Sequence, residues 1–166
     1  AVLSADDSAT VLAAQASAAL GLRHNSPEAA EAAHDKHRMR QLFAEAGVPS
    51  PRFKLYSLDD DAEEIADEIV YPCVVKPTRL SGSRGVIRAD SPFDFIAAHH
   101  RLKSILNVAG GDEFLVEDFI PGFEVALEGI LNDGGLKVLA LFDKPDPLDG
   151  PYFEETIYVT PSRLPE

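Results

Sequence analysis

The sequence predicts an α+β fold in which helices decorate an antiparallel sheet. Segments with helical spacing fill the first 50 residues, whereas short β-branched and aromatic runs alternate with helical segments after residue 51. The last third contains three apolar runs, and the turn sequence NDGG at 132–135 separates the second from the third. This turn is typical of a β-hairpin. Helices followed by such strands indicate an α+β architecture.

Three helices are expected before residue 50. The first covers residues 6–20 and stops at Gly21. The second, PEAAEAAH, follows the cap residue Ser26 and has proline at its first position. Asp35 caps the third helix, whose buried face carries Met39, Leu42, Phe43 and Ala46, while its other faces carry Lys36, Arg38 and Arg40.

The middle of the chain is predicted to alternate strands and helices. RFKLY at 52–56 predicts a strand, and Ser57 is expected to cap a helix that includes residues 62–69. YPCVVKP and VIRA predict two strands joined by a polar loop at 78–85. A helix starts at Ser91-Pro92 and ends at Gly110-Gly111, and its seam is Phe95, His99, Leu102 and Leu106. In this seam His99 is interpreted as a packing residue.

Three strands are expected in the last third, at 113–120, 123–131 and 136–142. The prolines after Lys144 predict a loop with one short extended piece, ETIYV at 155–159. The chain starts without methionine and stops in a proline-marked loop, so we expect a piece of a longer polypeptide. The expected parts are a helical tail of a preceding domain with a linker (1–50), a strand-and-helix subdomain (51–120) and the truncated start of a second subdomain (121–166).

Composition excludes several classes of protein. The 166 residues carry 15 Lys and Arg against 28 Asp and Glu, a formal net charge of -13, which would repel nucleic acid. No apolar run is long enough to span a membrane and no signal peptide is evident, so a cytoplasmic protein is expected. A homo-oligomer is compatible with this composition. The single cysteine, Cys73, is interpreted as a small buried hydrophobe.

One segment has the outline of a phosphate-binding loop. Lys76 follows three apolar residues on a strand, and the loop TRLSGSRGV supplies small residues whose amides can approach an anion. A lysine on a buried strand is costly unless its charge is used, either on a ligand or on a carboxylate partner. An ordinary hairpin loop also has this composition, and the GxxxxGK[ST] and GxGxxG motifs are both absent.

A second segment, LVEDFIPGFEVALEG, places an acidic residue at the end of an apolar strand. The turn that follows could let backbone groups of residues 118–120 face a planar base. Glu124 and Glu128 share one side of the next strand, and Glu128 is interpreted as solvated.

Four motifs in order over residues 24–146 resemble the ATP-grasp superfamily, in particular its amino-acid-ligase and carbamoyl-phosphate-synthetase-like branches. They are NSPEAAEAAHDKHRMRQLFAEAGVPSPRF, VVKPTRLSGSRGV, LVEDFIPGFEV and ALFDKPDP. The resemblance implies that 51–120 is the lid subdomain and that 121–166 begins the second ATP-grasp subdomain. It also implies an ATP-dependent ligase that joins a carboxylate to an amine through an acyl phosphate.

The resemblance further implies the residues that bind ATP. Lys36 would reach the nucleotide from outside the lid, Lys76 would contact the α- and β-phosphates, and Lys144 would lie near the terminal phosphate. The lid over the phosphates would be Ser81, Gly82, Ser83, Arg84 and Gly85. Glu117 would accept the adenine amino group, Phe119 and Ile120 would hold the ring edge, and Glu124 would bind the ribose hydroxyls.

No catalytic residue and no metal ligand are assigned. The family holds magnesium with acidic residues, often with an asparagine, and nothing after Lys144 supplies that pattern. The ligands of Mg²⁺ are therefore expected downstream, and Glu154 and Glu155 are interpreted as structural or substrate-side residues. Two alternatives stay open: a nucleotide-binding or assembly module without ligase activity, and a structural fragment that binds nothing.

Overall fold

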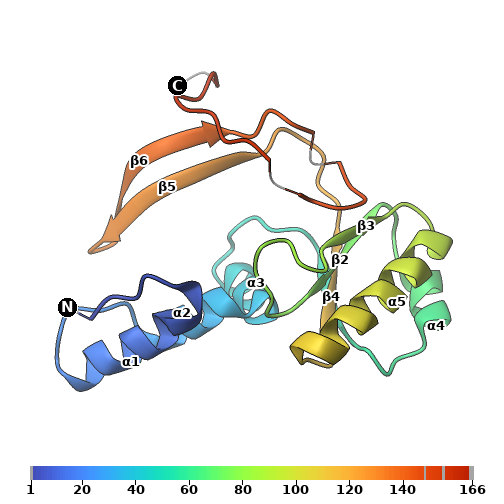
Figure 1. Ribbon diagram of the computed structural model, residues 1–166, viewed down its shortest axis with the longest axis horizontal. Coiled ribbons are helices and arrows are strands. Elements are labelled where there is room, and N and C mark those ends of the chain that lie inside the picture. Colours follow the sequence, from blue (N-terminus) through green and yellow to red (C-terminus); the bar gives the residue numbers. More distant parts are fainter. Residues whose placement is uncertain (1, 148, 155, 165–166) are drawn as a thin grey trace.

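The computed structural model of the protein describes residues 2–147, 149–154 and 156–164. A 3₁₀ turn, Asp7–Ala9, leads into α1 (Thr10–Ala19), and α2 (Pro27–His34) and α3 (Lys36–Glu45) follow. The side chains of Ser26 and Asp35 cap α2 and α3 as predicted, accepting backbone N–H bonds from Ala29 and Arg38. Helices α1 and α2 lie at one end of the molecule, and α3 lies between them and the four-stranded sheet (Figure 1).

A four-stranded antiparallel sheet is the main scaffold. Its strands are β1 (Phe53–Ser57), β2 (Cys73–Pro77), β3 (Ile87–Ala89) and β4 (Glu113–Asp118), in the order β1-β4-β2-β3. Helices α4 (Ala62–Glu68) and α5 (Pro92–Ala109) bury their apolar residues against one face (Figure 1). Val75, Phe95, Leu102 and Phe114 are fully buried there. Because side chains alternate along a strand, the neighbours of Val75 and Phe114 face the other side of the sheet.

The prediction that Ser57 caps the fourth helix was wrong. Ser57 is the last residue of β1, and a turn separates it from α4. The cap is Asp61, whose carboxylate accepts N–H bonds from Glu63 at 2.8 Å and from Glu64 at 3.3 Å. Serine and aspartate are both good caps, so composition alone did not locate the helix start.

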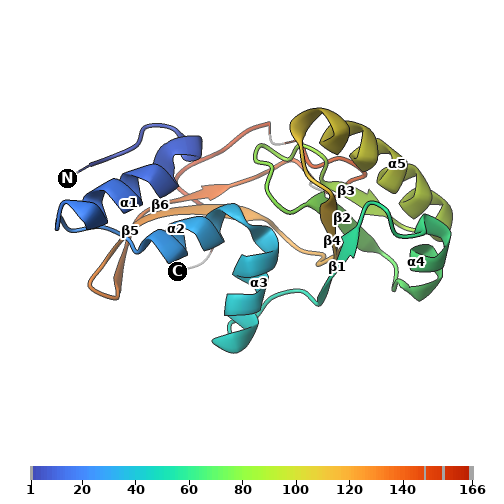
Figure 2. The same cartoon turned by 90° about the horizontal axis from the view of Figure 1, so that it is seen from below.

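Strands β5 (Val125–Asn132) and β6 (Gly135–Asp143) form the predicted hairpin as a separate two-stranded sheet. Asp133 and Gly134 have φ of 48° and 78°, as a tight hairpin turn requires. Figures 1 and 2 show that the hairpin extends over α1 and α2. Its tip reaches the loop after α1, where Arg23 pairs with Asp133 at 3.0 Å.

The segment after β6 returns to both sheets. Val159 pairs with Asp143, and Tyr152 forms a bridge with Ile87 on the edge strand β3. The extended piece expected at 155–159 is thus seen at its end, while Glu155 lies outside the described residues. None of the helices in the described part of the chain is long and apolar enough to cross a membrane.

Candidate functional site

A cleft of about 820 Å³ opens on the face of the sheet away from α4 and α5; we call it the main cleft. Seven of the twelve residues predicted to bind ATP line it: Lys76, Ser83, Glu117, Phe119, Ile120, Glu124 and Lys144. The antiparallel register of β2 and β4 explains why Lys76 and Glu117 lie close together. Lys76 lies opposite Leu115, and Val74 lies opposite Glu117. Lys76 and Glu117 are therefore diagonal neighbours on one face.

Glu117 is held between two cations. Its carboxylate accepts hydrogen bonds from Arg40 at 2.7 and 3.2 Å and pairs with Lys76 Nζ at 2.5 Å. All three side chains are largely buried. Burial alone would raise the pKa of Glu117, but the hydrogen bonds from Arg40 and the charge of Lys76 outweigh it and lower the pKa. For Lys76, burial is the largest effect, and its pKa is lowered although Glu117 opposes the shift.

Lys36 lies at the start of α3, close to Lys76 but outside the lining of the main cleft. Its Nζ donates to the carbonyl oxygen of Leu80 at 2.5 Å, and its backbone N–H donates to Thr78 at 2.9 Å. Burial and the nearby charge of Lys76 lower the pKa of Lys36. Lys36 thus contacts the polar loop that was predicted to cover phosphates, and Lys76 lies nearby.

The linker after β4 forms another wall of the main cleft. Ile120 is exposed, and Phe119 donates its backbone N–H to Pro72 at 3.1 Å. Glu124 and Lys144 face each other across the start of the hairpin, 2.5 Å apart. The carboxylate and the ammonium therefore occupy one end of the main cleft.

The predicted lid residues divide between two clefts. Ser83 lines the main cleft and also a second cleft of about 740 Å³, whereas Gly82, Arg84 and Gly85 line the second cleft alone. Ser81 lines neither, and its carbonyl oxygen accepts a hydrogen bond from Arg84 Nε at 3.3 Å. Gly82, Ser83 and Gly85 all have positive φ, which turns the loop sharply.

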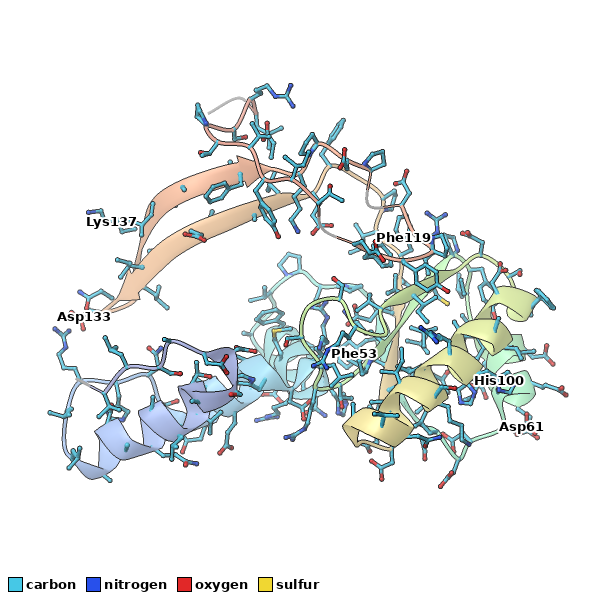
Figure 3. All side chains as sticks on the ribbon, viewed as in Figure 1. Phe53, Asp61, His100, Phe119, Asp133 and Lys137 are labelled. Carbon is cyan, nitrogen blue, oxygen red and sulfur yellow. The ribbon has the colours of Figure 1, made fainter. Side chains whose placement is uncertain are left out.

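Two functional candidates were missed from the sequence. Arg40 was placed outside the buried face of its helix, but its side chain is only 16% exposed and it binds Glu117. Arg88 on β3 stacks on the Phe119 ring, with 4.1 Å from the guanidinium carbon to the ring centre, and donates to the carbonyl oxygen of Asp149 at 2.7 Å. Figure 3 shows Phe119 beside the segment that follows β6. No sequence signal connects residues 77 or 61 positions apart.

The described residues contain no group of three or more His, Cys, Asp or Glu side chains that could hold a metal ion. Glu154 lines the second cleft, and Glu155 lies outside the described residues.

Known proteins are similar to this chain over most of the residues that form the site. Positions 69–166 match the ATP-grasp domain. The chain is 33% identical over 172 residues to alanine–anticapsin ligase of Bacillus subtilis. This alignment covers 92% of this chain and 36% of that enzyme. The crystal structure of L-amino acid ligase from Bacillus licheniformis superposes with a TM-score of 0.77 and 26% identity over 99% of this chain and 37% of that one.

A third similarity concerns a structure with bound nucleotide. The biotin carboxylase domain of Hydrogenobacter thermophilus 2-oxoglutarate carboxylase, solved in complex with MgADP, ADP and bicarbonate, has a TM-score of 0.69 and 21% identity; the match covers 92% of this chain and 35% of that one. The chain belongs to the ATP-grasp family. It spans about 36% of the length of the alanine–anticapsin ligase that it matches.

Proposed function

We propose that the full-length protein is an ATP-dependent ligase that joins a carboxylate to an amine, and that the main cleft binds its ATP. The observation that carries the proposal is the convergence of Lys76, Glu117, Phe119, Glu124 and Lys144 on one cleft of an ATP-grasp domain. The similar enzymes are named as ligases of alanine and of L-amino acids, which supports an amino acid as one substrate.

Each wall of the main cleft suits a different part of the nucleotide. Lys76 and Lys144 supply positive charge for phosphates, and Lys36 at the start of α3 adds a third cation nearby. The linker at 119–120 offers backbone groups other than the Phe119 N–H to the edge of the base, and Glu124 offers a carboxylate to the ribose hydroxyls. Lys76 binds Glu117, so phosphate binding has to compete with this ion pair or share the lysine.

The proposed reaction has two steps. An oxygen of the substrate carboxylate attacks the γ-phosphorus, the bond to the β,γ-bridging oxygen breaks, and ADP and an acyl phosphate form. The amine then attacks the acyl carbon, phosphate leaves, and loss of a proton gives the amide. The lysines of the main cleft stabilise the phosphoryl charge and orient the nucleotide, which is how phosphoryl transfer is usually catalysed. Magnesium would neutralise further phosphate charge, and we assign it no ligand among the described residues.

The experiment measures ATP binding first and turnover second, both in the full-length protein. With ATP and magnesium at one hundred times the dissociation constant, stabilisation by about 2.7 kcal/mol is expected. Lys76→Ala should weaken ATP binding by roughly ten- to a hundred-fold, because a charge-assisted hydrogen bond is lost. The matched control is Lys54→Ala on β1, whose exposed side chain pairs with Glu68 and should leave ATP binding unchanged.

The turnover assay separates the proposal from its alternatives. ADP release that requires two amino acids, with formation of an amide, supports the ligase. ATP binding without such release in any amino-acid combination would instead favour a nucleotide-binding or assembly module. Absence of ATP binding would overturn the proposal altogether.

A further inference from the structure

Most arginines of this acidic protein form ion pairs with carboxylates, and two of them have no such partner among the described residues. Of the nine arginines in the sequence, seven have a carboxylate partner among the described residues. Arg84 and Arg101 have none within the described part of the chain. Both line the second cleft. In a chain with a net charge of -13, two unpaired cations on one concave surface indicate a place where an anion from outside can bind.

The second cleft combines this charge with apolar walls. Arg84 comes from the loop after β2, Arg101 and Ile105 come from α5, and Tyr152 and Phe153 come from the segment after β6. Val86 and Ile87 complete the apolar part of the lining. Three chain segments that are distant in sequence therefore build one site, as ligand-binding clefts usually are built.

Charge balance identifies the class of anion. Among the described residues the lining contains two arginines and one carboxylate, Glu154, so their formal charges sum to +1. A triphosphate carries several negative charges and would leave the apolar walls unused. A monocarboxylate with an apolar body matches both features, because guanidinium groups bind carboxylates well and the aromatic side chains can cover the body.

We propose that the second cleft is a binding site for a small organic monocarboxylate with an apolar body, held by Arg84 and Arg101. The site is distinct from the main cleft, although Ser83, Val86 and Phe153 line both. The bound acid would lie against the same loop that we expect to cover ATP. It is either the acid that is ligated, which rests on the function proposed above, or an effector that acts on this loop.

Binding is tested with 3-phenylpropionate, titrated into the full-length protein without nucleotide and followed by calorimetry. We expect saturable binding, and no saturable binding of 2-phenylethylamine, which lacks the carboxylate. Arg101→Gln should weaken binding about ten-fold, since a charge-assisted hydrogen bond is lost. Glu154→Gln should strengthen it several-fold, because a negative charge leaves the site.

The matched control is Arg38→Gln, which removes the same charge from an exposed pair with Glu45 on α3. It should leave the affinity for 3-phenylpropionate unchanged. Equal losses in Arg38→Gln and Arg101→Gln would reduce the effect to net charge and overturn the proposal. Failure of 3-phenylpropionate to saturate the wild-type protein would overturn it as well.

Turnover distinguishes the two sources of the acid. If the acid is the substrate, Arg101→Gln raises the KM for the ligated acid and leaves the affinity for ATP unchanged. If it is an effector, added 3-phenylpropionate changes the KM for ATP and does so in the wild type only. ATP binding is measured separately, so failure of the proposed ligase function is distinguishable from failure of this site.

Discussion

Arg88 and Phe119 are stacked, with 4.1 Å between the guanidinium carbon and the ring centre. The same guanidinium pairs with Asp90 and donates to the carbonyl oxygen of Asp149, while the backbone N–H of Arg88 donates to Pro151 at 2.8 Å. Phe119 and Asp149 line the main cleft, whereas Arg88 does not. One residue on the edge strand therefore positions two walls of the proposed ATP site.

Arg88→Ala is expected to weaken ATP binding by roughly ten-fold, because both walls lose their common support. Hydrogen exchange at 149–152 should become faster at the same time. Arg88→Lys keeps the charge opposite Asp90 but lacks the planar group that stacks and donates, so it should restore little of the affinity. Calorimetric titration with ATP and exchange mass spectrometry measure the two effects; unchanged values in Arg88→Ala would show that the contact has no role in positioning.

The buried group of Glu117, Arg40 and Lys76 predicts unequal losses of stability for two substitutions. Glu117→Ala leaves Arg40 and Lys76 buried without the carboxylate between them, and should lower the free energy of unfolding by about 3 to 5 kcal/mol. Lys76→Ala should cost only about 1 kcal/mol, because Arg40 still donates both of its hydrogen bonds to Glu117. Urea denaturation of the two variants measures the difference. Equal losses would mean that Lys76, and not Arg40, is the main partner of the carboxylate.

Local sequence rules predicted most of the fold. The caps Ser26 and Asp35, the Asn-Asp-Gly-Gly hairpin and the helix over 92–109 depend on residues that are neighbours in the chain, and the structure confirms them. Glu117 was assigned only through family resemblance, and its contact with an ATP base stays a prediction. Its partners could not be predicted, since a pairing with Arg40 depends on how α3 packs across the sheet.

The path of the segment after residue 144 also could not be predicted from the sequence. The segment after residue 144 was predicted as a loop, yet its position beside β3 depends on Arg88 and on Gly150, whose φ is +94°. A Cβ at Gly150 would lie 2.7 Å from Arg88 Cβ, so only glycine allows this approach. Such contacts are long-range and carry no periodic signal in the sequence.

His99 predicts a pH dependence of stability. Its side chain is buried between Phe95 and Phe114, and neither ring nitrogen has a hydrogen-bond partner among the described residues. Burial, and the nearby His100 and Lys103, lower the pKa of His99. The unfolded chain then binds a proton more readily than the folded one, so the contribution is complete above the unfolded pKa of about 6.5 and is lost as pH falls below it.

The matched variants for this effect are His99→Phe and His24→Ala. His99→Phe fills the same space with an apolar ring and should remove the part of the loss of unfolding free energy below about pH 6.5 that comes from His99. His24 is exposed, so His24→Ala controls for the loss of an imidazole outside the core. Denaturation midpoints across this pH range give the answer, and a wild-type profile that stays flat would show that His99 finds a solvent or protein partner.

Alanine substitutions at Gly82 and Gly85, in the loop after β2, distinguish the cost of a steric clash from the cost of a strained backbone. Gly82 and Gly85 have φ of +65° and +76°, so alanine is strained at both positions. A Cβ at Gly82 meets nothing within 4 Å, whereas a Cβ at Gly85 would lie 2.9 Å from Leu102 Cδ1. Leu102 is fully buried in α5 and has no room to turn away. Gly82→Ala should therefore cost about 1 kcal/mol of unfolding free energy, and Gly85→Ala about 2 to 4 kcal/mol. Urea denaturation compares them directly, and equal costs would mean that the loop shifts away from α5 as a unit.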